Sequence, residues 1–414
     1  MLNKIMLFLS FAVLLFSVGC KNVESKKDVI TLSNNNIKSK DNQQFQTSNI
    51  RKIIKETIDN IEYTAIVTAE LECCIQHIDL QKTSIKECKK LVLPERVNGY
   101  KVVELSGRVE GEEKTTHNIF GDVMESNVAN TWICKEKNIQ SEKVIKEIII
   151  PNNVKVLKKH CFSGMESLEK ISLPKGLEEI KGNIFYSDKK LTTITIPSAT
   201  TKGVEYLSGK AWKRFKIDSN NPKYKIKNGV LLSKDGRVIY GICTSKSAVR
   251  IGKNVTKISS GGLTTNKKCN ISVDKRNKVF AKSGQCIYKR KNGELVCISA
   301  SDGKVTLSEK VKMLNNAVMV AGKKVKYIKY ATRKRKNFSL KIKLDAWNHA
   351  KWNNGYSISN FCTWDLRGRN VPKNYLPENL CMRKIIVLEK DKKAYKKWLK
   401  ENHVDKVLDI LIRK

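Results

Sequence analysis

The chain has 414 residues and a formal net charge of +40, from 80 Lys and Arg against 40 Asp and Glu. This length would hold two or three ordinary domains, and the charge favours anionic partners and solubility without defining a fold. The five histidines lie far apart and no His/Cys cluster has zinc-ligand spacing, so we expect neither a metal nor a cofactor.

The first twenty residues, MLNKIMLFLSFAVLLFSVGC, carry one early lysine, Lys4, and then an apolar run from 5 to 18. The run is too short to span a bilayer comfortably, and no other stretch is long and apolar enough to do so. Residues 1–19 are therefore predicted to be a secretory signal peptide.

The end of this run resembles a bacterial lipoprotein signal, in which cleavage precedes a cysteine that then carries lipid. Gly19 and Cys20 match the pattern, whereas Ser17 departs from it. The resemblance implies lipid attachment at Cys20; the alternative is an ordinary signal peptide with a stray cysteine. Residues 20–50 are polar, cannot bury a core, and are predicted to form a flexible tether.

The twelve cysteines do not indicate a disulfide framework, because they are scattered without CxxC pairs. Cys161 occupies an apolar position and is expected to be a small buried hydrophobe. Adjacent Cys73 and Cys74 are not expected to bridge each other, and a bond involving Cys286 or Cys297 stays open.

Residues 144–197 repeat an apolar-x-apolar-Pro signal every 23 residues. The signal ends at Pro151, Pro174 and Pro197, and the preceding isoleucines and leucines share the spacing, as do Phe162 and Phe185. Each unit reads as a short strand closed by proline, because proline cannot donate the next ladder hydrogen bond. Such a unit cannot bury its apolar face alone, so stacked units are predicted.

The stretch IIIPNNVKVLKKHCFSGMESLEKISLP resembles the BspA-type leucine-rich repeats of bacterial surface proteins. The resemblance implies an α/β repeat fold over residues 51–414: a leucine-rich repeat solenoid of about 23-residue units with a parallel strand layer and β-hairpin insertions. Insertions interrupt the pattern near 106–143, expected to be an exposed loop, and near 337–380.

Further stretches fit the same family. Residues 91–105 resemble its entry unit, and 218–242 and 274–299 resemble its hairpin insert, because Asn-Gly, Asp-Gly and Ser-Gly pairs bracket β-rich runs. The next strand after Ile194 is expected at Ile217, and Val305 and Ile328 restore the spacing. Residues 383–399 resemble a terminal strand and short helix.

Alternate strand residues should face outward onto an open concave surface. They form a polar strip without paired carboxylates, a nucleophile beside a histidine, or a glycine-rich phosphate loop, so we expect a non-catalytic binding face; the alternative is ordinary solvated residues. The candidate ligand-binding residues are Lys170, Ser172, Thr193, Thr195, Lys216, Asp218, Asn270, Ser272, Tyr327 and Lys329.

Residues 323–336 hold eight basic side chains and no acid, interleaved with Tyr327 and Tyr330. This pattern suits an anionic wall polymer, a sulfated glycan or nucleic acid, although nucleic acid is not the expected physiological partner. The alternative is a solvated rim, with Tyr330 facing inward. The candidate polyanion patch is Lys323, Lys324, Lys326, Arg333, Lys334, Arg335 and Lys336.

The second insertion is rich in aromatics, with Trp347, Trp352, Tyr356 and Trp364 among asparagines. These rings either stack on sugars or bury the gap before the terminal unit, and burial is the commoner role. The first insertion carries Trp132 and Cys134 without an evident role.

The resemblance implies an exported, lipid-anchored cell-surface protein that binds an extracellular protein or glycan as an adhesin does. The membrane would be contacted only through the N-terminal lipid. Two rival hypotheses remain: an envelope structural protein held to anionic wall polymer by its charge, and an enzyme whose site lies in an insertion.

Overall fold

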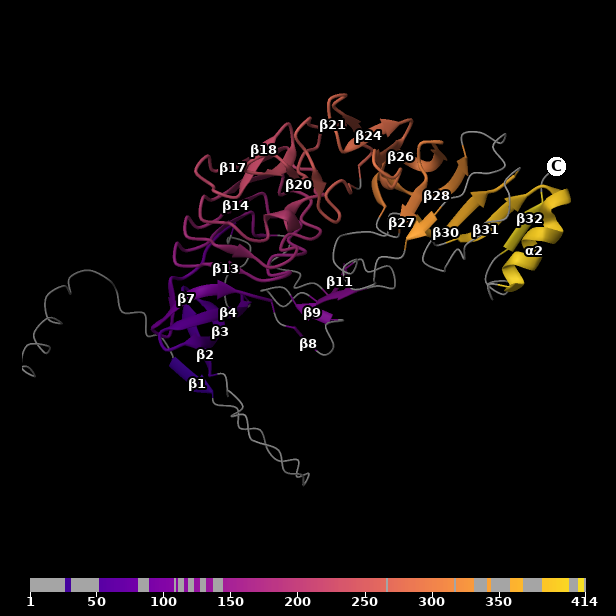
Figure 1. Cartoon of the computed structure of the whole chain (residues 1–414). Coiled ribbons are helices and arrows are strands. Elements are labelled where there is room, and N and C mark those ends of the chain that lie inside the picture. The colour runs from indigo at the N-terminus through magenta and orange to yellow at the C-terminus, as the bar shows by residue number, and fades with distance from the viewer. Residues whose placement is uncertain are drawn as a thin grey trace, which may run out of the picture.

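A computed structural model describes residues 27–30, 52–80, 89–107, 109–110, 115–117, 123–126, 132–136, 144–265, 267–315, 318–330, 341–343, 358–367, 382–401 and 409–412. Its strands follow a curved arc from the N-terminal sheet to a C-terminal helix (Figure 1). The predicted signal peptide and Cys20 lie outside the described residues.

The chain begins with an antiparallel meander that the repeat pattern did not predict. It comprises β1 (Lys27–Ile30), β2 (Ile53–Ile58), β3 (Ile61–Ala69) and β4 (Glu72–Asp79). β1 lies within the predicted tether, so residues 27–30 of that segment pair with the folded part. A hairpin of β6 (Arg96–Val97) and β7 (Tyr100–Leu105) follows, and β7 pairs with β4 in parallel.

The predicted strand-Pro signals form a parallel ladder. It joins β5 (Lys90–Val92), β12 (Glu147–Ile149) and β14 (Lys170–Ser172), with Ile148 opposite both Leu91 and Ile171. β16 (Thr193–Ile196) contacts β14 and pairs with β17 (Arg214–Ile217). The repeat prediction is confirmed here, because residues 23 apart in the sequence stand side by side.

Spacing changes at β17, and the expected position of its strand was wrong by two residues. Ile194 stands opposite Phe215, whereas Ile217 pairs with Ile196. Trp212 is buried just before β17, and its indole donates a 2.8 Å hydrogen bond to the Leu207 carbonyl. This unit is therefore shorter between its strands than the units before it.

Each unit also contributes a second, shorter strand. β13 (Val156–Leu157) pairs with β7 and with β15 (Glu179–Ile180), again in parallel. Between the two ladders Phe162 and Phe185 stack with ring centroids 6.2 Å apart, and Trp212 continues the row 6.4 Å from Phe185. The aromatic residue that recurs in the sequence therefore packs in the core between the two ladders of strands.

Two β-hairpin modules follow, as predicted. β18 (Tyr224–Lys227), β19 (Val230–Ser233) and β20 (Val238–Ile242) form the first, and β20 also pairs with β22 (Lys257–Ile258). The second comprises β24 (Phe280–Ser283), β25 (Cys286–Lys289) and the start of β26 (Leu295–Leu307). Between them, β21 (Ala248–Ile251) pairs with β23 (Asn270–Val273) in parallel.

The C-terminal part is a mostly parallel sheet. β26, β28 (Met319–Tyr330), β30 (Ile358–Asp365), β31 (Met382–Val387) and β32 (Asp409–Ile412) lie in that order. Val305 stands opposite Ile328, which confirms the predicted spacing. β27 (Met313–Asn315) pairs with β29 (Lys341–Lys343), and α2 (Lys392–Glu401) follows β31 as expected.

The first insertion contains an antiparallel sheet and is not the plain loop that we expected. Its strands are β8 (Val109–Glu110), β9 (Thr115–His117), β10 (Val123–Ser126) and β11 (Trp132–Glu136). Figure 1 shows this sheet on the inner side of the arc.

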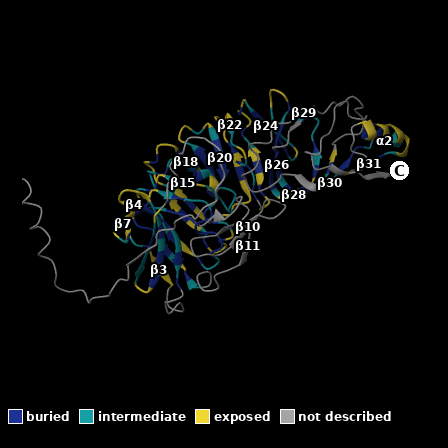
Figure 2. Ribbon diagram, turned by 90° about the horizontal axis from the view of Figure 1, so that it is seen from below, coloured by how far each residue is buried: buried dark blue, intermediate teal, exposed yellow. Residues whose placement is uncertain are grey.

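Buried apolar side chains form three clusters along the chain. One runs from Ile54 to Cys243, one from Val230 to Ala321, and one from Cys286 to Leu399. Figure 2 shows buried residues along the arc from β3 to β31. The fold is strand-rich with few helices, namely α2 and short turns such as η2 (Val204–Leu207) and η4 (Glu389–Asp391), so the α/β label overstated the helix content of the described part.

Candidate functional site

The predicted strip follows the outward-facing positions of the first ladder. Lys170, Thr193, Thr195 and Lys216 are exposed, and Ser172 is half-buried. The Lys170 ammonium makes a 2.7 Å ion pair with Glu147 on the neighbouring strand, and this bond lowers the pKa of the Glu147 carboxyl. The structure therefore brings these side chains onto adjacent strands, as the alternation predicted.

The shift at β17 changes the partners on the strip. Thr193 stands opposite Arg214 and Thr195 opposite Lys216, so Arg214 joins the strip although the sequence pattern missed it. Asp218 was expected beside Thr195 but lies in the turn after β17. There its carboxylate accepts a 2.8 Å hydrogen bond from the backbone N–H of Asn220.

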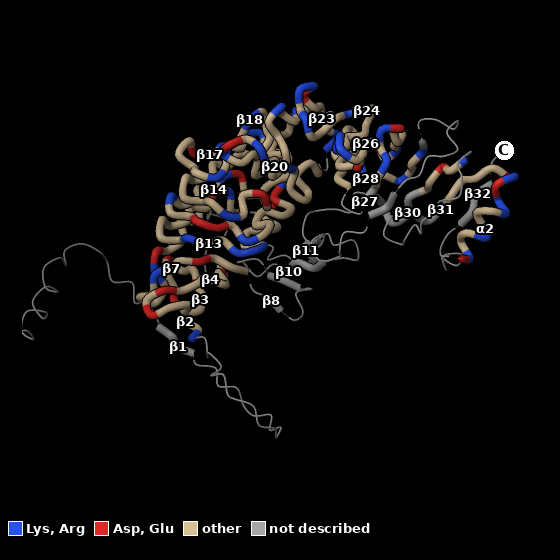
Figure 3. The backbone as a smooth tube through the Cα atoms, in the orientation of Figure 1, with Lys and Arg blue, Asp and Glu red and all other residues tan. Residues whose placement is uncertain are grey.

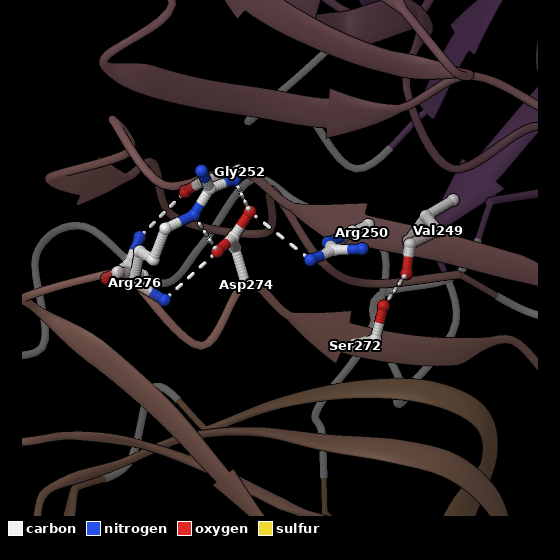
Figure 4. A network of polar contacts seen from close by, with 7 residues as sticks. Val249, Arg250, Gly252, Ser272, Asp274 and Arg276 are labelled. Atoms are coloured by element: carbon white, nitrogen blue, oxygen red, sulfur yellow. Dashed lines mark hydrogen bonds and ion pairs between the residues drawn. The ribbon is translucent and has the colours of Figure 1, made fainter.

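Asn270 and Ser272 are exposed on β23, next to β21. The side-chain Oδ1 of Asn270 accepts a 2.7 Å hydrogen bond from Lys282. The Ser272 hydroxyl donates a 3.2 Å bond to the Val249 main-chain carbonyl (Figure 4). Arg250 stands opposite Ser272 and was missed, although it lies between buried Val249 and Ile251 in the alternating run of β21.

A charged network lies directly after β23. Asp274 accepts hydrogen bonds from Arg276 Nε at 3.2 Å and Nη2 at 3.1 Å, and Arg250 Nη2 lies 3.2 Å from the same carboxylate (Figure 4). The bonds from Arg276 hold the pKa of Asp274 well below its usual range. The two arginine side chains are 61% and 71% exposed, whereas that of Asp274 is 10% exposed.

Tyr327 and Lys329, the last strip residues, lie on β28. Lys329 is exposed, but the Tyr327 hydroxyl donates a 2.8 Å hydrogen bond to Asp365. Arg367 donates hydrogen bonds to the same carboxylate from Nε at 2.9 Å and from Nη2 at 2.7 Å. Burial alone would raise the pKa of Asp365, but the bonds from Arg367 and Tyr327 lower it to about 2. Tyr327 is thus engaged in a network within the protein.

Only part of the predicted polyanion patch is described. Lys323, Lys324 and Lys326 are exposed on β28. Arg333, Lys334, Arg335 and Lys336 lie outside the described residues, as does the side chain of Tyr330. Figure 3 shows lysines and arginines distributed along the whole described chain, so this patch does not stand apart from its surroundings in sign of charge.

The aromatic insertion is described in part. Trp364 is 1% exposed, opposite Ile328 and Ile385, which confirms the burial interpretation for this ring. Trp347, Trp352 and Tyr356 lie outside the described residues. The cysteines with described side chains, including Cys161, Cys286 and Cys297, are buried and form no disulfide among the described residues, and burial raises the pKa of Cys161.

One buried polar cluster was not predicted. Asp188 is 1% exposed, and its Oδ1 accepts a 2.9 Å hydrogen bond from the backbone N–H of Met165. Lys210 donates a 2.6 Å bond to the Asp188 main-chain carbonyl, with its ammonium 4.7 Å from the Trp212 ring centroid. Burial raises the pKa of Asp188 and lowers that of Lys210 to about 8. The buried Asp188 carboxylate joins Met165 to the following unit, and Lys210 covers it from a partly buried position.

Metal-ligating side chains are dispersed in the described part of the chain. It contains no group of three or more His, Cys, Asp or Glu side chains that could hold a metal ion. Among these same residues, no helix has both the length and the apolar character needed to cross a membrane.

Parallel strands from short repeated units, stacked around a continuous apolar core, define a leucine-rich repeat protein with a polar outward face. Residues 136–269 match a family model described as a BspA type leucine rich repeat region (6 copies). The resemblance inferred from the sequence is confirmed: this segment belongs to the BspA-type leucine-rich repeats.

Solved structures of several bacterial proteins are similar to the chain at low sequence identity. The pneumococcal vaccine antigen PcpA is 13% identical, with 87% of this chain and 98% of that chain covered and a TM-score of 0.37. A leucine rich cell surface protein from Faecalibacterium prausnitzii A2-165 is 11% identical, with 87% and 95% covered and a TM-score of 0.38. A leucine rich repeat protein of T. pallidum is 16% identical, with 51% and 83% covered and a TM-score of 0.26. No curated protein matches the chain.

Proposed function

We propose that this chain is a non-catalytic cell-surface protein that binds an extracellular protein or glycan through its outward strip, as an adhesin does. The observation that carries the proposal is the row of exposed amine and hydroxyl side chains on the neighbouring strands β14, β16 and β17. A row held on a packed core is already ordered, so little conformational entropy is lost when a partner binds.

Export and lipid anchoring at Cys20 are part of the same proposal, and they rest on the N-terminal sequence. The polar residues that follow would lift the repeats away from the membrane. The cell-surface assignment also agrees with the family of the repeat, although a ligand is not specified by it.

The first test changes Lys170→Gln, Thr193→Ala and Lys216→Gln together. Binding of the full chain in mild detergent to matrix proteins and glycans would be measured at physiological salt. For a partner retained by the unchanged protein, we expect a loss of about tenfold or more in affinity, because central contacts dominate binding. The matched control is Lys253→Gln, Thr256→Ala and Lys257→Gln, which removes the same residue types from exposed positions around β22.

An equal loss in both triple variants would contradict a role for the strip. It would favour the alternative, an envelope protein held to anionic wall polymer by charge, which the net charge of +40 and the spread of lysines over the described chain support (Figure 3). Binding of that kind should fall steeply with salt for every polyanion, because exposed charges are screened.

A further inference from the structure

The turn after β23 repeats the turn after β17 in its backbone hydrogen bonds. Asp218 Oδ1 accepts the N–H of Asn220 at 2.8 Å, and Asp274 Oδ1 accepts the N–H of Arg276 at 3.0 Å. In both turns the carbonyl of the aspartate also accepts the N–H of the residue three further on, at 3.0 and 2.9 Å. The two turns therefore fold in the same way.

The two arginines are found only beside the second turn, Arg276 within it and Arg250 on the neighbouring strand β21. Where the second turn has Arg276, the first has Asn220. Arg250 stands opposite Ser272, and in the earlier pair of strands its place is taken by Thr195, opposite Lys216. Because the first turn forms without these arginines, the backbone does not need them.

The geometry leaves both guanidinium groups available to a ligand. Arg276 uses Nε and Nη2 on Asp274, and Arg250 uses Nη2, while the side chains stay 71% and 61% exposed. A guanidinium carries five N–H donors, so most donors of the pair point away from the carboxylate. The single carboxylate of Asp274 contacts two guanidinium groups, so the cluster keeps a net positive charge. The same contacts fix the positions of the two guanidinium groups.

The same Asp-x-Arg pattern occurs at Asp365 and Arg367, where it has another role. Arg367 is only 18% exposed, and its fork serves a buried carboxylate that also accepts the Tyr327 hydroxyl. Asp274 is buried as well, at 7% exposure against 6% for Asp365, so the two sites differ in their arginines. The cluster at Asp274 differs because its cations outnumber the carboxylate and face solvent.

We propose that Arg250 and Arg276 bind a tetrahedral oxyanion group, sulfate or phosphate, carried by a polysaccharide. The planar guanidinium fork matches two oxygens of such a group, which a lysine ammonium cannot do. This inference rests on the proposed function and names the partner chemistry for the same outward strip.

The neighbouring residues favour a polysaccharide over a protein. Ser272 and Asn270 lie beside the pair on β23 and offer hydroxyl and amide groups to sugar hydroxyls. Protein interfaces are anchored by large aromatic or apolar side chains. In the described residues the exposed large hydrophobics are Leu71, Val92 and Tyr206, and none of them lies on β16, β17, β21 or β23.

The test replaces the two planar guanidinium groups by ammonium groups and so keeps the charge unchanged. The full chain carrying Arg250→Lys and Arg276→Lys would be compared with the unchanged chain on an immobilised sulfated polysaccharide and on an immobilised phosphorylated polysaccharide, at physiological salt. Arg96→Lys with Arg237→Lys is the matched control, because both arginines are exposed and neither forms an ion pair with Asp274. Circular dichroism and thermal melting would show that each variant folds.

We expect the Arg250/Arg276 variant to bind about fivefold or more weakly and the control to stay within about twofold, because only the former loses paired hydrogen bonds to the oxyanion. Retention on one polymer alone would identify sulfate or phosphate as the source of the group. Equal affinity of both variants and the unchanged chain would overturn the inference. So would failure of the unchanged chain to bind either polymer, whereas the proposed function would stand if a protein or neutral glycan still bound in a strip-dependent way.

Discussion

His160 is buried in a turn between stacked units, where its backbone has a φ of 62°. Its ring Nδ1 lies 3.1 Å from the Ser163 hydroxyl. Burial, helped by the nearby charge of Lys159, lowers the pKa of His160 to about 3. The folded state therefore favours the neutral form of the His160 ring.

This lowered pKa predicts a pH dependence of folding. The stabilisation by neutral His160 is fully present above the unfolded pKa of about 6.5 and is lost as pH falls toward the folded pKa of about 3. His160→Asn keeps a residue type that tolerates positive φ but does not titrate. Between pH 7 and pH 3 we expect the unchanged chain to lose about 3–5 kcal/mol more unfolding free energy than the variant.

Urea denaturation at a series of pH values would measure this difference. Parallel pH profiles for the two proteins would show that His160 is not the group that responds.

The arginine pair shows how far sequence reasoning reached at single residues. Alternation along β14 and β16 placed Lys170, Thr193 and Thr195 correctly on the outward face. Arg250 and Asp274 escaped notice because their contact depends on which strands are paired. The sequence motif Asp-x-Arg also looks the same whether its arginine is exposed, as Arg276 is, or largely buried, as Arg367 is.

At the scale of elements, Gly203 lies directly against the backbone of Ile180 in the preceding unit. It precedes η2 with a φ of 79°, and a Cβ placed on it would stand 1.7 Å from the Ile180 carbonyl oxygen. Gly99 has nearly the same φ, 82°, but a Cβ there would meet nothing within 4 Å. Comparing alanine substitutions at the two glycines therefore distinguishes the cost of positive φ from the cost of a steric clash.

Gly203→Ala should therefore destabilise the chain by about 1–3 kcal/mol more than Gly99→Ala, because both alanines bear the strain of positive φ but only one displaces a neighbouring strand. Thermal melting of the two variants beside the unchanged protein measures the difference. Similar losses in both would mean that the backbone at 203 moves aside without cost.

The 23-residue spacing predicted the ladder elements well, since Ile148 pairs with Ile171 and Val305 with Ile328. The hairpins followed from turn chemistry, as at Asn228-Gly229, where both residues have positive φ. The position of β17 was missed because the buried Trp212 occupies a place that the count of residues could not reveal. The N-terminal meander carries no repeat, so spacing gave no signal for it.

At the scale of the whole molecule, the three apolar clusters imply that unfolding is not all-or-none. Each unit contacts chiefly its neighbours, so stability is a sum of local terms and couplings. α2 buries Tyr395, Trp398 and Leu399 against the C-terminal cluster and no other.

Trp398→Ala should therefore open the C-terminal end alone. We expect it to cost about 3–5 kcal/mol locally, with lost hydrogen-exchange protection in β31 and α2 and unchanged protection in β12 to β15. Phe162→Ala, in the first cluster, is the reciprocal control and should show the opposite pattern. Loss of protection throughout the chain in either variant would indicate a single cooperative unit.

The matching turns at Asp218 and Asp274 lie fifty-six residues apart, and so do the hairpins that follow them, at Tyr224 and at Phe280. The segment between these two turns therefore begins and ends in the same backbone geometry. If a gene rearrangement duplicated or deleted this segment, the chain would still connect to the strands on either side in the same way. The chain can thus lengthen or shorten in evolution by whole modules, and each added copy would bring a new outward surface on which a different set of side chains could be selected.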